Sequence, residues 1–333
     1  MRPPEPTAAP TAAPQRWFID PAAIMQIKNL TLRAKTIVEG FTSGLHRSPL
    51  HGFSVEFSEY RPYVLGDDPR NLDWKLLART DRYYVKQYED ETNRRCYLAV
   101  DQSRSMSYGN GQYTKAEYAR TLAATLAYYL HVQRDAVGIL TCGNRSSEFL
   151  PPRHRTGHLH QIMRLLGQDS EGLDSDLSGA LTQLASLSRR RGLVILISDL
   201  LTDPQSLLQP LGYLRGRGHE LLILRVLEPS EMSLQLEKSS MLRDMETGRE
   251  MYIDPALARD EYRRRFDAHH QQLVDICHRR GGRLTTVRTD QPLDLALLEL
   301  ISHTPHLAAG GSTTRQRPRA GSARPAAESA RGV

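Results

Sequence analysis

The sequence predicts an α/β protein with a doubly wound, mostly parallel sheet and helices on both faces, preceded by a smaller β-containing insertion. Short apolar runs alternate with amphipathic helical segments from residue 96 onward, which is the order of a sheet covered by helices. These runs are continuously apolar, as in parallel strands that are buried on both faces. With 333 residues, of which 39% are hydrophobic, the chain is long and apolar enough to form a core. A wholly disordered chain is therefore excluded.

Composition divides the chain into four regions. Residues 1–16 and 308–333 are rich in Pro, Ala, Gly, Ser and Arg, which is typical of disordered tails. Residues 17–95 form an N-terminal helix and a charged, β-rich segment, and residues 96–307 form the α/β domain. The C-terminal tail has five Arg against one Glu and so carries four of the six net positive charges. Because the folded part is close to neutral, the sequence argues against nucleic acid as a partner.

Before residue 96 the pattern predicts one helix over Ile24–Val38 and strands near Ser54–Tyr60 and Tyr83–Tyr88. The segment Glu59–Arg79 contains acidic and basic residues in nearly equal number. Two interpretations stay open for it. It is either a salt-bridge cluster that fixes the insertion to the sheet or a docking face for a partner protein.

From residue 96 onward, strands and helices alternate. Thr114 and Glu117 form a capping-box pattern ahead of a helix that runs to about Val132. Asp254 and Pro255 open a long helix that stops at Gly281 and Gly282. The expected strands are Tyr97–Val100, Val137–Thr141, an edge strand at Ser147–Leu150, Leu193–Ile197, Leu221–Val226 and Leu284–Val287. The other expected elements are helices over 159–166, 177–184, 207–214 and 293–302, and a hairpin over Met241–Ile253.

Cysteine usage and hydropathy indicate a cytoplasmic protein with no membrane span. Cys96, Cys142 and Cys277 are odd in number and far apart, which fits neither a disulfide framework nor a thiolate metal site. The most apolar stretches are shorter than ten residues, and the first residues lack the apolar region of a secretory signal.

Hydroxyl and carboxylate side chains follow two of the predicted strands, where a doubly wound sheet places its binding crevice. Asp174-Ser175-Asp176, at the start of the helix over 177–184, is expected to meet them at the same edge. These oxygen donors suit Mg²⁺, with Mn²⁺ or Ca²⁺ as alternatives. A simpler interpretation is that Asp101 and Ser103 only shape a turn or cap a helix. The candidate metal ligands are Asp101, Ser103, Ser105, Ser175 and Asp199.

Two motifs resemble known families. The Asp-x-Ser-x-Ser pattern of Asp101–Ser105, with Ser175 and Asp199, resembles the metal-ion-dependent adhesion site of von Willebrand factor A domains. Arg61–Trp74, followed by Ala78-Arg79, resembles the signature of the family called domain of unknown function 58. The resemblance covers about residues 40–287 and implies a von Willebrand factor A-like domain in a bacterial partner of MoxR-type AAA+ ATPases. Where that family has Gly-Gly-Thr-Asp-Leu, residues 173–177 are Leu-Asp-Ser-Asp-Leu.

The expected function is that of a non-enzymatic adaptor that captures a partner carboxylate on Mg²⁺ and works with such an ATPase on a client protein. One alternative is a Mg²⁺-dependent hydrolase or phosphatase that uses Asp101 and Asp199. Another is a nucleic-acid-binding protein led by the Arg-rich tail. No general base is evident, since His269-His270 and His303-x-x-His306 are expected on solvated helix surfaces. Gly109–Lys115 lacks the residue order of a phosphate loop, so we expect it to be a flexible loop beside the metal.

Overall fold

The computed structural model describes residues 19–47, 60–62, 79, 83–86, 94–143, 147–155, 157–168, 176–233, 240–243 and 250–303. The chain forms two compact units, one of Met1–Ser54 with Thr92–Ala308 and one of Val55–Glu91 with Ala309–Val333. In the second unit, β1 (Tyr60–Pro62) pairs antiparallel with β2 (Tyr84–Lys86). β2 lies within the predicted strand Tyr83–Tyr88, whereas β1 shares only Tyr60 with the predicted strand Ser54–Tyr60, whose other residues lie outside the described ranges. The side chains of the charged segment Glu59–Arg79 lie outside the described residues, apart from Arg79, which is exposed.

A six-stranded sheet forms the centre of the first unit. Its spatial order is β10-β7-β6-β3-β4-β5, and every neighbouring pair is parallel except β4 with β5. The apolar runs of the central strands are buried on both faces, as the sequence predicted. The strands are β3 (Arg95–Asp101), β4 (Ala136–Cys142), β5 (Glu148–Arg153), β6 (Leu193–Ser198), β7 (Glu220–Leu227) and β10 (Gly282–Arg288).

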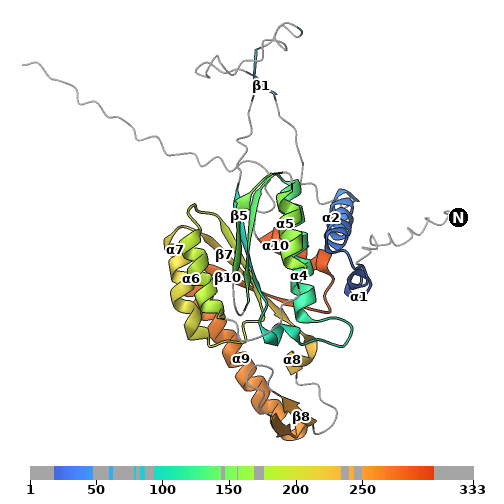
Figure 1. The fold of residues 1–333 in the computed structure, drawn as a ribbon, viewed down its shortest axis with the longest axis vertical. Coiled ribbons are helices and arrows are strands. Elements are labelled where there is room, and N and C mark those ends of the chain that lie inside the picture. Colours follow the sequence, from blue (N-terminus) through green and yellow to red (C-terminus); the bar gives the residue numbers. More distant parts are fainter. Residues whose placement is uncertain are drawn as a thin grey trace, which may run out of the picture. The chain divides into compact units, whose positions relative to one another are not determined.

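Helices cover both faces of this sheet, which confirms the predicted fold class. Figure 1 shows α6 (Leu177–Leu187) and α7 (Leu208–Gly216) on one face. On the other face lie α4 (Lys115–Val132) and α5 (His158–Leu166). Each layer has its own apolar core against the sheet, and the C-terminal half of α9 (Pro255–Arg279) joins the layer of α6 and α7.

The order of the strands reverses between β3 and β6. From β3 the chain continues outward to β4 and β5, and from β6 it continues the opposite way to β7 and β10. The loops that follow β3 and β6 therefore leave neighbouring strands in opposite directions and open a crevice at the carboxyl edge. Asp101 ends β3, and Asp199 follows β6 directly.

The N-terminal helical segment is broken in two, so the prediction of one helix over Ile24–Val38 is wrong. The two helices are α1 (Pro21–Met25) and α2 (Leu30–Arg47). The break lies at Asn29, whose side chain accepts a hydrogen bond from the backbone N–H of Leu32 at 3.0 Å and so caps the start of α2. Arg33 holds the connection by donating to the carbonyl of Met25 at 2.6 Å.

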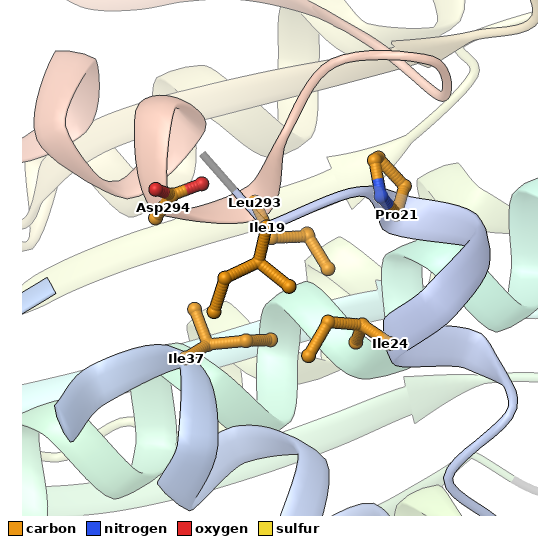
Figure 2. A pocket seen from close by; sticks show the side chains of 6 residues that line it. All are labelled: Ile19, Pro21, Ile24, Ile37, Leu293 and Asp294. Carbon is orange, nitrogen blue, oxygen red and sulfur yellow. The ribbon is translucent and has the colours of Figure 1, made fainter. Parts of the chain in front are cut away.

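Both N-terminal helices pack beside α10 (Leu293–His303), and a small apolar pocket lies between them (Figure 2). The side chains that line this pocket are Ile19, Pro21, Ile24, Ile37, Leu293 and Asp294. Asp294 is in the first turn of α10, and burial raises the pKa of its carboxyl group. The pocket thus joins the N-terminal helices to the last helix of the domain.

The remaining elements follow the predicted order. The hairpin is formed by β8 (Ser240–Arg243) and β9 (Glu250–Ile253), and α9 begins at Pro255 as expected. The chain leaves α9 through Gly281, whose φ of +63° lies in the left-handed region. Short helical turns η2 (Arg104–Ser107) and η3 (Pro204–Leu207) follow β3 and β6, and α8 (Pro229–Ser233) follows β7. In the described part of the chain, no helix has the length and apolar character to cross a membrane.

Candidate metal centre

Asp101 lies at the end of β3 and is 4% exposed. One carboxylate oxygen accepts a hydrogen bond from the backbone N–H of Ser103 at 2.8 Å. The other accepts one from the Ser198 hydroxyl, at the end of the neighbouring strand β6, at 2.5 Å. Asp101 therefore holds the loop after its own strand and is tied to the adjacent strand. Burial, and next the charge of Asp199, raise the pKa of Asp101 to about 6.

The two serines after Asp101 converge. Ser103 is the residue just before the turn η2 and is 6% exposed, while Ser105 lies within the turn and is partly buried. Their hydroxyl oxygens are 2.9 Å apart and hydrogen-bonded to each other. Two hard oxygen donors are thus placed together beside a buried carboxylate, as the spacing predicted.

Asp199 also lies at this edge, but it is already paired with a cation. It is 1% exposed, and its Oδ2 atom accepts a hydrogen bond from Lys115 Nζ at 2.8 Å. Its Oδ1 atom accepts from the backbone N–H of Leu201 at 3.2 Å. Leu200, between them, adopts a φ of +54°, which turns the chain sharply after Asp199. Asp199 is therefore fixed both by its own loop and by Lys115.

Lys115 is the main feature of this edge that the sequence interpretation missed. It is the first residue of α4, its side chain is fully buried, and its ammonium also contacts Glu231 Oε1 on α8 at 2.6 Å. Burial by itself would lower the pKa of Lys115, but the charges and hydrogen bonds of Asp199 and Glu231 raise it overall. The loop Gly109–Lys115, expected beside the metal, thus ends in a buried ion pair.

Arg225 on β7 forms a second buried cation behind Asp199. It is 0% exposed and donates from Nε to the carbonyl of Asp199 at 3.1 Å. Its other nitrogens contact His270 Nδ1 at 3.1 Å and His269 Nδ1 at 3.4 Å. The expectation that His269 and His270 lie on a solvated surface is therefore wrong, because both are half-buried against Arg225. His303 and His306 have no described side chains.

Of the five predicted ligands, four are described, and Ser175 lies outside the described residues. Ser198 belongs to the same cluster but was not among the predicted ligands, although it precedes Asp199 at the end of an apolar strand. Within the described ranges, no group of three or more His, Cys, Asp or Glu side chains is placed to hold a metal ion, so a site here would depend on hydroxyl oxygens. Asp101, Ser103 and Ser105 suit a hard cation that binds oxygen. Asp199 can bind such a cation only in competition with the ammonium of Lys115.

The family model described as "Protein of unknown function DUF58" matches residues 59–272. The chain belongs to the DUF58 family. An uncharacterized protein of Mycobacterium tuberculosis is 31% identical to this DUF58 chain over 277 residues, which cover 82% of this chain and 86% of the relative. An uncharacterized protein of Mycobacterium bovis matches equally well.

Two of the solved structures that are similar to this DUF58 protein have low sequence identity to it. BatB from Bacteroides thetaiotaomicron is 18% identical, with a TM-score of 0.44, and the match covers 64% of this chain and 99% of BatB. The SpRpn10 VWA domain is 14% identical, with a TM-score of 0.40, and the match covers 66% and 99% of the two chains. The fold of the DUF58 chain is established by its own strand order.

Proposed function

We propose that this DUF58 protein is a non-enzymatic adaptor that binds a carboxylate of a partner protein on a Mg²⁺ ion. The observation that carries the proposal is the convergence of the Ser103 and Ser105 hydroxyls, 2.9 Å apart, next to the buried carboxylate of Asp101. They lie at the carboxyl edge of the sheet, where the strand order reverses and doubly wound folds bind ligands.

In this proposal the hydroxyls of Ser103, Ser105 and Ser175 hold the ion directly, and Asp101 and Asp199 hold it through water. The occupied oxygens of Asp101 support an outer role, since Ser103 and Ser198 already donate to them. Mg²⁺ bound mainly by neutral oxygens keeps Lewis acidity and water-exchangeable positions, one of which an Asp or Glu of the partner can take. Mn²⁺ or Ca²⁺ would serve in the same way.

The proposed partners are a MoxR-type AAA+ ATPase and a client protein, in the cytoplasm. This part rests on the resemblance of Arg61–Trp74 to the family signature, and most of that segment lies outside the described residues.

A pull-down from the native lysate tests the binding function. Ser103→Ala and Ser105→Ala should lose partners that the wild type retains in Mg²⁺ and releases in EDTA. Ser107→Ala is a matched control, because Ser107 is exposed on the same turn η2 and should bind as the wild type does. Partners retained equally by all variants and in EDTA would contradict the proposal.

The non-enzymatic part is tested separately. The two carboxylates that a phosphatase would use are both engaged, Asp101 with Ser103 and Ser198, and Asp199 with Lys115. We therefore expect no Mg²⁺-dependent hydrolysis of p-nitrophenyl phosphate. Turnover that Ser103→Ala abolishes would favour a Mg²⁺-dependent phosphatase instead.

A further inference from the structure

The ammonium of Lys115 occupies a carboxylate oxygen of Asp199 that a divalent cation bound there would need. Nζ is 2.8 Å from Asp199 Oδ2 and 2.6 Å from Glu231 Oε1, and the lysine side chain is 0% exposed. Desolvating a charge is costly, so a buried ammonium depends on these two carboxylates. The ring of Tyr108 lies 5.8 Å from Nζ, and its hydroxyl is hydrogen-bonded to Ser230, so the cation is enclosed from this side as well.

The position of Lys115 is fixed by its backbone. Thr114 caps α4 by accepting from the N–H of Glu117 at 3.1 Å, and Glu117 Oε2 accepts from the N–H of Thr114 at 3.0 Å. The N–H of Lys115 itself donates to the carbonyl of Tyr108 at 2.8 Å. The ammonium is thus carried on the rigid first turn of a core helix.

Glu231 is held independently of Asp199. Its Oε2 atom accepts from the N–H of Glu228 at 3.1 Å, and its carbonyl accepts from the Tyr262 hydroxyl at 2.5 Å. Asp199 therefore reaches Lys115 from the loop after β6, and Glu231 reaches it from α8, which follows β7. If Asp199 turned toward another cation, Lys115 would retain Glu231 as a partner.

Two carboxylates share the single ammonium of Lys115, so this cluster keeps one negative charge that a further cation can balance. They are Asp199 and Glu231, and each also accepts a hydrogen bond from a backbone N–H.

We propose that Lys115 is a built-in competitor of the metal ion: it pairs with both Asp199 and Glu231 when no ion is bound, and with Glu231 alone when Asp199 turns to the ion. This inference rests on the proposed metal site. It identifies Lys115 as the residue that limits the affinity of the site for divalent cations, and Glu231 as the acceptor that makes the exchange possible. Both act on the ion through Asp199, as positioning residues.

The test is titration calorimetry of the full chain with Mg²⁺ and with Mn²⁺. Lys115→Met keeps the apolar stem and removes the ammonium, so it should bind either ion about tenfold or more tightly than the wild type. Lys28→Met removes the same charge from an exposed position and should leave the affinity unchanged. A Lys115→Met protein that binds no more tightly than Lys28→Met overturns the inference.

Glu231→Gln provides a second test that does not depend on the folding of Lys115→Met. This change removes the charge of Glu231, so that of these two carboxylates only Asp199 still neutralises the ammonium. Because Asp199 is then held more strongly by Lys115, metal binding should weaken by about tenfold. Unchanged or tighter binding overturns the inference.

The two proposals fail differently. A wild type that binds no ion beside a Lys115→Met protein that does would support the role of Lys115 and contradict the metal-dependent function. A wild type that binds Mg²⁺ as tightly as Lys115→Met would support the function and contradict the role of Lys115. If neither protein binds an ion, both proposals are wrong.

Discussion

The hydroxyl of Ser198 donates a hydrogen bond to Asp101 across the two adjacent strands at which the strand order of the sheet reverses. The same hydroxyl accepts a hydrogen bond from the backbone N–H of Leu200 at 2.9 Å. Ser198 is 0% exposed, so it links the carboxylate to the sharp turn at Leu200 out of contact with water. The candidate site is therefore built on a contact between strands as well as on its loops.

Replacing Ser198 with Ala should destabilise the protein. The change leaves a buried carboxylate oxygen and the Leu200 N–H without this partner, and such a loss costs about 1 to 3 kcal/mol. Urea denaturation measures the change in the free energy of unfolding. Ser186→Ala, at an exposed position of α6, should change it by less than about 0.5 kcal/mol. Equal stability of both variants would mean that the Asp101–Ser198 contact contributes nothing.

Mg²⁺ should raise the thermal midpoint of the wild type by a few degrees, because an ion that binds only the folded state stabilises it by mass action. Asp101→Asn keeps an acceptor for the Ser103 N–H but removes the charge, so its midpoint should rise by less than half as much. Thermal melts with and without 10 mM Mg²⁺ test this. Ser107→Ala should respond as the wild type does, and an equal response of Asp101→Asn would contradict the metal site.

Asp135, at the opposite edge of the sheet, should make the stability of the protein depend on pH. It lies just before β4 in a hollow of about 650 Å³ that Arg94, Arg95, Arg190 and Arg191 also line. Burial raises its pKa from 3.8 to about 6. Between these values the folded state holds more protons than the unfolded state, so the stability contributed by this group falls as pH rises through that window.

Asp135→Asn should therefore be more stable than the wild type by about 1 to 3 kcal/mol at pH 7.5, and the difference should shrink toward zero at pH 4. Urea denaturation at several pH values measures it. Glu148→Gln, an exposed carboxylate on β5, should show no such trend. A constant difference across this pH range would show that burial of Asp135 is not the cause.

Thr114→Ala removes the N-cap of α4 and should cost about 1 kcal/mol. Because Lys115 follows directly, the variant should also change Mg²⁺ affinity if the helix start positions the ammonium. Thr182→Ala on the exposed surface of α6 is the matched control and should leave the affinity unchanged. Chemical denaturation and calorimetry together separate the two effects, and lost stability with unchanged affinity would mean that the cap does not position Lys115.

The order of strands and helices was predictable because buried parallel strands are continuous apolar runs and because Thr114 and Pro255 mark helix starts. The cluster at Asp101 was predictable because polar residues after parallel strands share one edge. Lys115 was not predictable, since its partners lie 84 and 116 residues away along the chain. A lysine after a Gly-rich loop has no local pattern that distinguishes a buried ammonium from a solvated one. The break at Asn29 was missed because apolar spacing continues across it.

The antiparallel strand β5 contains Pro151 and Pro152, and it is the last strand on its side of the described sheet. Proline has no N–H, and the N–H groups of successive residues point to opposite sides of a strand, so one of these two prolines leaves the free edge without a donor that an incoming strand would need. Gly138 on β4 permits the arrangement, because a Cβ there would lie 2.6 Å from the Pro152 nitrogen. The missing donor makes this side of the sheet less able to add a strand of another molecule, which is one of the ways in which edge strands avoid aggregation.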